Sequence, residues 1–165
     1  MKRADLIASI GTDDLEQIES LLKSFLRETS ARCAALVDRT GRLLAVVGDT
    51  GGIDQVTFAS LAAADFAASD QLAVLLGESE FSSLYHHSDR QSMYLADVAG
   101  WAILAALFDR RTTLGMVRIK AKGVVGRLGR VFRELAERGP SGSVVQMEVG
   151  WADDVESEID RLFTE

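Results

Sequence analysis

Apolar residues recur at three- and four-residue spacing over two long stretches of the chain, residues 12–26 and 112–138. This spacing is typical of an amphipathic helix that buries one face. Thr12 is predicted as the N-cap of the first helix, because aspartates follow it in the first turn. Three glycines interrupt the second stretch: Gly123, Gly126 and Gly129. Each is expected to lower the stability of a helix by about 1 kcal/mol relative to alanine.

A third stretch, residues 54–76, has the length of a helix but a different pattern, and Gly77 is expected to stop it. Between residues 56 and 68 its few polar residues do not gather on one face: Thr57, Ser60 and Asp65. A helix that is apolar nearly all round must be covered on both sides. One side can pack on a sheet of the same chain, and the other side is expected to need a partner. The small residues Ala59, Ala63 and Ala67 share a face on which another backbone could approach closely.

Five short apolar segments are predicted to be strands: residues 32–38, 43–47, 81–88, 93–98 and 101–108. The first two form a hairpin around Gly41, and the last two are joined by a tight turn at Ala99 and Gly100. The segment 101–108 is apolar throughout, as a central strand covered on both faces would be. The order of elements predicts one α/β domain over residues 1–138.

Composition narrows the functional classes. The length of 165 residues fits one domain with short tails, and the net charge of −7 argues against binding to nucleic acid or to anionic membranes. The N-terminus does not resemble a signal peptide, and no uninterrupted apolar run is long enough to span a bilayer. Cys33 is the only cysteine and lies in an apolar strand, so a buried thiol is expected. These features predict a soluble, cytoplasmic protein without membrane insertion.

The candidate catalytic and ligand motifs are weak. The glycine-rich loop 48–52 lacks the Gly-Lys-Ser/Thr ending of a phosphate-binding loop. His86 and His87 are adjacent in a strand, so their side chains point to opposite faces and cannot chelate one metal. The stretch 123–129 faintly resembles the Gly-x-x-Gly loop of KH domains, but a solvated basic helix face explains it better. We therefore expect no cofactor, no metal site and no catalytic centre.

Charge is segregated near the C-terminus. Residues 110–138 are strongly basic, whereas residues 139–165 hold seven acids against the single cation Arg161. We divide the latter into a linker, 139–150, and an acidic segment, 151–165, with apolar residues at helical spacing: Val155, Ile159, Leu162 and Phe163. The segment could fold onto the basic helix of its own dimer, recognise a partner, or stay disordered. Its amphipathic spacing favours a recognition helix that lies in a partner's groove.

Several stretches, taken in order, resemble the roadblock / dynein-light-chain family, and most closely its bacterial polarity regulators. They are Ala59–Leu61, Leu72–Phe81, Ser92–Leu95, Phe108–Arg118 and Ile159–Phe163. The resemblance implies a five-stranded antiparallel sheet, with the helix 54–76 on one face and the other two helices on the opposite face. It also implies a homodimer through the second helix and the third strand, 81–88, and leaves open a dimer of dimers. The interface residues expected from this reading are Ala59, Ala63, Phe66, Ala67 and Asp70.

The same resemblance implies a function. Such dimers bind a small Ras-like GTPase of the MglA type and stimulate its GTP hydrolysis without an active site of their own, in bacterial cell polarity or gliding motility. The alternative from a different class is a scaffold dimer that leaves hydrolysis unchanged. A third hypothesis, nucleic-acid binding through the basic helix, predicts association that weakens steeply with salt.

Overall fold

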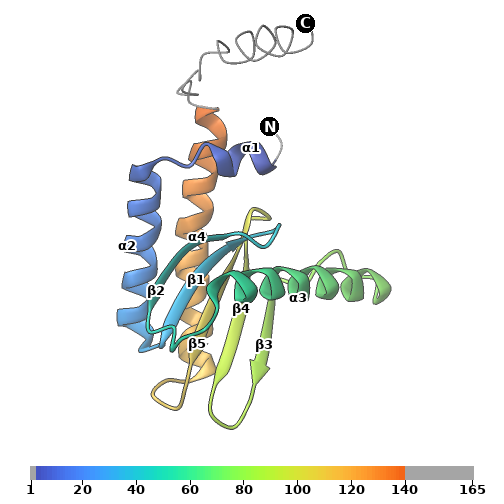
Figure 1. Cartoon of the computed structure of the whole chain (residues 1–165). Helices are drawn as coiled ribbons and strands as arrows, with labels where there is room; N and C mark the ends of the chain where they lie inside the picture. The colour runs from blue at the N-terminus through green and yellow to red at the C-terminus, as the bar shows by residue number, and fades with distance from the viewer. Residues whose placement is uncertain (1–2, 140–165) are drawn as a thin grey trace, which may run out of the picture.

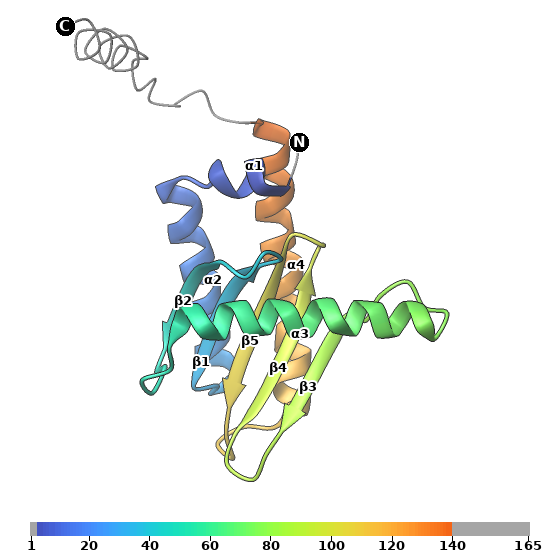
Figure 2. The same cartoon turned by 45° about the vertical axis from the view of Figure 1, so that its right-hand side comes forward.

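The computed structural model describes residues 3–139 and forms one α/β unit. Its elements are α1 (Arg3–Ala8), α2 (Thr12–Thr29), β1 (Cys33–Asp38), β2 (Leu43–Gly48), α3 (Gln55–Leu75), β3 (Ser83–His87), β4 (Ser92–Val98), β5 (Ala102–Phe108) and α4 (Leu114–Arg138). The strands form one antiparallel sheet in the order β2-β1-β5-β4-β3. Helix α3 crosses one face, and α2 and α4 lie side by side on the other (Figures 1 and 2). The predicted fold class is confirmed.

Alternation along the strands divides the core into two layers. In β5, the whole of which is buried, Leu104 and Ala106 pack toward α2 and α4, while Ile103 and Ala105 pack toward α3. The same alternation holds in β1, which lies beside β5. A central strand covered on both faces reads as a continuous apolar run, as the sequence indicated for residues 101–108.

Helix α4 continues through all three of its glycines. Its predicted apolar stripe is buried: Val117, Ala121, Val124, Leu128, Val131, Phe132 and Leu135. Gly129 lies against the β4–β5 turn, where an added Cβ would stand 3.4 Å from Cβ of Ala99. At Gly123 and Gly126 an added Cβ would meet no atom within 4 Å. Packing on the described chain therefore explains only Gly129.

Replacing Gly126 with alanine is expected to stabilise the protein by up to about 1 kcal/mol, because alanine loses less backbone entropy in a helix. The matched substitution Gly48→Ala should destabilise it. Gly48 has a φ of +91°, and its Cβ would lie 2.4 Å from the carbonyl oxygen of Arg32. Urea denaturation of both variants measures the two changes, and a loss of stability in Gly126→Ala would contradict our account of α4.

The N-terminal region differs from the prediction in two ways. Helix α1, which no pattern indicated, places Leu6 in the core between α2 and α4. The N-cap of α2 is Gly11 and not Thr12. The carboxylate of Asp14 accepts a hydrogen bond from the Gly11 amide at 3.0 Å, and its other oxygen accepts one from Arg138 at the end of α4. One carboxylate therefore caps α2 and joins it to the last turn of α4.

This contact predicts a pH dependence. Burial opposes ionisation of Asp14, but hydrogen bonds from Arg138 and Gly11 outweigh it and hold the pKa of Asp14 below its ordinary value of 3.8. A carboxyl with a lowered folded-state pKa contributes stability above its unfolded pKa, and the contribution is lost as pH falls through the folded one. Asp14→Asn should thus destabilise the protein at pH 7 and reduce its loss of stability below about pH 4. Denaturant titrations across that range measure both effects; parallel pH profiles would contradict the assignment.

Candidate partner-binding surface

Helix α3 and the residue that follows it, Leu76, expose large apolar side chains, and neither of the two charged residues among them is fully exposed. We call this set the α3 patch: Val56, Leu61, Leu72, Val74, Leu75 and Leu76. Their exposure reaches 81% at Leu75. The only charged residues between positions 55 and 76 are Asp65 and Asp70, and both are half-buried. Large exposed apolar side chains gathered on one helix are typical of interaction sites, so the α3 patch is the candidate partner-binding surface.

The C-terminal turns of α3 extend past the β3 edge of the sheet, as both views show (Figures 1 and 2). In this projecting part only Ala73 is buried, whereas Leu72 and the three residues 74–76 are exposed. Because no strand lies beneath these turns, leucines on several sides of the helix stay uncovered. The expectation that the helix has more apolar surface than one chain can cover is thus met at its C-terminal end.

Helix α3 is long and apolar enough to cross a membrane by length and composition alone. Its inner face, however, packs on the sheet through Ala59, Ala62 and Phe66. We therefore describe it as one layer of the α/β fold.

The structure places three of the predicted interface residues on the inner side of α3. Ala59, Ala63 and Phe66 face the sheet of their own chain and are buried there, because a helix lying on a sheet turns its narrow alanine side inward. Ala67 is exposed and stays a candidate, and Asp70 is half-buried in an ion pair. The α3 patch adds exposed apolar residues to the candidate interface.

Asp70 belongs to a cluster that no sequence pattern indicated. Arg39, in the β1–β2 turn, donates to Asp70 of α3 at 3.0 Å and also to Asp97 at the end of β4. Its guanidinium lies 4.7 Å from the ring centre of Phe66. Asp97 is fixed in turn by the amide of Gly100, which donates to it at 2.8 Å. The cluster fixes the position of α3 over the sheet and leaves the patch facing outward.

Strand β3 is an edge of the sheet, and within the described chain it pairs only with β4. Its outer row of backbone groups is therefore available to another strand. Nε2 of His86 lies 2.6 Å from a carboxylate oxygen of Asp65 on α3, so the edge strand and the patch helix are connected. His87 points to the other face, toward Ser92, as the alternation predicted.

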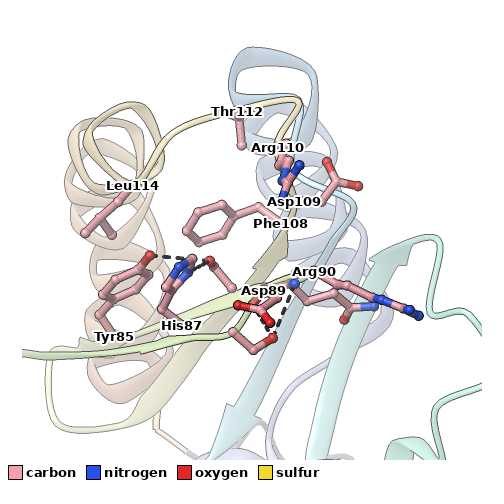
Figure 3. Close-up of a pocket in the computed structure, with 12 residues that line it drawn as sticks. Tyr85, His87, Asp89, Arg90, Phe108, Asp109, Arg110, Thr112 and Leu114 are labelled. Atoms are coloured by element: carbon pink, nitrogen blue, oxygen red, sulfur yellow. Dashed lines mark hydrogen bonds between the residues drawn. The ribbon is translucent and has the colours of Figure 1, made fainter.

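A pocket of about 310 Å³ lies on that other face, between the β3–β4 hairpin and the loop from β5 to α4 (Figure 3). Tyr85 and Phe108 line it with rings stacked 6.3 Å apart, and Arg90 and Arg110 lie at its rim. Nδ1 of His87 is 2.9 Å from the Ser92 hydroxyl. No carboxylate within residues 3–139 forms a hydrogen bond with His87, so the described residues do not complete a Ser-His-acid triad.

The remaining predictions concern the C-terminal segment, metal binding and Cys33. The residues Val155, Ile159, Leu162 and Phe163, with the segment 151–165 and nearly all of the linker, lie outside the described residues. Among residues 3–139 no three His, Cys, Asp or Glu side chains are grouped to hold a metal ion. Cys33 is buried as expected, and burial raises the pKa of its thiol, which disfavours the reactive thiolate.

Comparison with known proteins agrees with this geometry. The family model of the Roadblock/LC7 domain matches residues 17–108. A structure of MglB in a tetrameric arrangement and the structure of Myxococcus xanthus MglB each share 32% identity with the chain, with a TM-score of 0.73, and cover 76% of it and 95% of their own chains. The gliding protein MglB of Thermus thermophilus shares 34% identity, with a TM-score of 0.70, and covers 76% of this chain and 94% of its own.

A more distant Roadblock/LC7 domain from Streptomyces avermitilis, at 14% identity and a TM-score of 0.63, shares the fold alone. None of the curated proteins compared with the chain matches it. The family model covers more than half of the chain, and the MglB structures cover three quarters of it at over 30% identity. The chain belongs to the Roadblock/LC7 family.

Proposed function

We propose that the protein is a non-catalytic, cytoplasmic regulator that forms a homodimer through α3 and β3 and binds a small Ras-like GTPase of the MglA type. The observation that carries the proposal is the α3 patch, an uncharged apolar surface beside an open sheet edge. Similarity to MglB from two bacteria supports the role in polarity or gliding motility.

The dimer follows from two surfaces that need covering at the same place. Two copies related by a two-fold axis would pair β3 with β3 and bring their α3 patches together. This arrangement would satisfy the unpaired backbone groups of the edge and bury leucines of the projecting turns. A platform made by both copies would then accept the GTPase, and pairs of dimers could associate further.

Ala67→Arg is expected to weaken the dimer, because it places a charge on the exposed, uncharged face of α3. Light scattering after size exclusion should show a shift from dimer toward monomer at micromolar concentration. Ser20→Arg, which adds the same charge to the exposed surface of α2, is the matched control and should leave the mass unchanged. Ala63→Arg is unsuitable, since Ala63 is buried and the variant would test folding. A monomeric unaltered protein would contradict the proposal.

GTPase stimulation needs its own experiment. The purified protein is mixed with an MglA-type GTPase, and phosphate release is followed under single-turnover conditions. We expect acceleration of about tenfold or more, equivalent to roughly 1.4 kcal/mol of the barrier, because positioning of the GTPase's own groups supplies most of such catalysis. Ala67→Arg should lose the acceleration and Ser20→Arg should keep it. Binding with unchanged hydrolysis would favour the alternative function, a scaffold dimer.

The C-terminal segment enters the proposal as a recognition element for the GTPase. Deleting residues 151–165 should then reduce stimulation while leaving the dimer intact, since the α3 and β3 surfaces stay in place. A truncated protein with full stimulation would remove this segment from the mechanism.

A further inference from the structure

The outward face of α4 is basic, and no element of the described chain covers it. Arg118, Lys122, Arg130 and Arg133 are exposed there, and none of them forms an ion pair with a described residue. By contrast, Lys120 and Arg138, at the flank toward α2, are paired with Glu28 and Asp14. The two described acids on this helix near the face are Glu134 and Glu137, both in its last turns.

The same face has an exposed apolar residue near its centre and two glycines, which have no side chain, beside it. Ile119 is 71% exposed, and the spacing 119, 122, 126, 130, 133 places it on one stripe with three of the cations. Gly126 lies within that stripe and Gly123 beside it, and neither glycine has an atom that an added Cβ would touch. These glycines cost helix stability without serving the packing of this chain, and they leave room for another segment close to the α4 backbone.

We infer that the acidic segment 151–165 docks on this face of α4 in the same chain. The charges are complementary: the segment has acids on both sides of its apolar residues, and the face carries four exposed cations around Ile119 and the glycines. Val155, Ile159 and Leu162 recur at the spacing of a helix stripe that would lie over that centre. This docking of the segment goes beyond the proposed function, because it occurs in the protein when no GTPase is bound.

The length of chain allows the contact. Segment 151–165 follows α4 after the linker 139–150, whose twelve residues can extend over about 40 Å. The distance back along α4 from Arg138 to Lys122 is sixteen residues, or about 24 Å at 1.5 Å per residue. The segment can therefore turn back beside its own helix without strain. A GTPase that recognises the segment would first have to release it from α4.

The test places a nitroxide spin label at Ser157→Cys in the full-length chain, with Cys33→Ala removing the buried native thiol. Backbone amide signals of Gly123 and Gly126 should lose most of their intensity at low salt. They should recover near 1 M NaCl, where the Debye length is roughly 3 Å. The pair Lys122→Glu and Arg130→Glu should also restore them. The matched pair Lys23→Glu and Arg27→Glu, on α2, should not.

Three outcomes would overturn the inference. Unbroadened α4 signals in the labelled chain at low salt would show that the segment does not lie there. Broadening that appears only when labelled, NMR-silent chains are mixed with unlabelled, isotope-enriched ones would place the segment on a neighbouring copy. Broadening that persists at 1 M salt and in the α4 charge variants would exclude charge complementarity. Because no GTPase is present, failure here leaves the stimulation experiment unaffected, and the reverse also holds.

Discussion

Phe66→Ala is expected to destabilise the protein by about 3–5 kcal/mol, the range for removing a fully buried phenylalanine. Phe66 is the largest fully buried side chain of α3, and five of the eight other buried residues in its cluster are alanine. Small neighbours cannot collapse into the space it would leave. Its loss would also remove the ring over which the Arg39 guanidinium lies. Chemical denaturation monitored by circular dichroism measures the change.

Leu75→Ala provides the comparison for this result, because Leu75 belongs to the same helix but is 81% exposed. In a dilute monomeric state it should change stability by no more than about 0.5 kcal/mol, as surface substitutions usually do. If Phe66→Ala proved equally mild, the position of α3 over the sheet would be wrong. If Leu75→Ala were costly only at high protein concentration, the cost would report on the dimer.

Arg39→Leu is expected to cost roughly 3 kcal/mol, toward the lower end for breaking a buried ion pair, because solvent still reaches the cluster. The substitution leaves the carboxylates of Asp70 and Asp97 without their cation, and the Asp97 side chain is only 15% exposed. The same denaturation measurement gives the value. We also expect α3 to exchange its amide protons faster, since the cluster fixes that helix to two turns of the sheet.

The contribution of the Arg39 charge can be measured separately from the contribution of its packing. With Asp70→Asn and Asp97→Asn already present, Arg39→Leu should cost clearly less, because no unpaired carboxylate is left behind. Arg27→Leu, at an exposed position of α2, is the control for losing an arginine as such. An equal penalty for Arg39→Leu in both backgrounds would mean that packing of its side chain, and not its charge, stabilises the site.

Most of the fold could be predicted from local pattern. Residues 101–108 read as a central strand because their burial on both faces requires an apolar side chain at every position. The helix ends at Asp54, Gly77 and Thr113 follow from capping chemistry that acts within a few residues. Helix α1 was missed because six residues are too few to show a period.

The candidate site was harder to predict, since it depends on which side of a helix meets the sheet. In α3 almost every residue is small or apolar, so the spacing of Ala59, Ala63 and Ala67 does not tell the inner face from the outer one. The bulk of Phe66 among the alanines was the available signal that this side is the inner one. The partners of Arg39 lie 31 and 58 residues away in sequence, and no local pattern connects them.

Helix α4 also has a practical consequence. Its 25 residues extend for about 38 Å, and it ends beyond the sheet, on the face opposite α3 (Figure 1). A fluorescent protein or affinity tag joined on the C-terminal side of α4 would therefore be attached far from the leucines of α3. Fusion proteins with the tag at this end should leave the α3 patch accessible, whereas insertions in the loop between α3 and β3 should obstruct it.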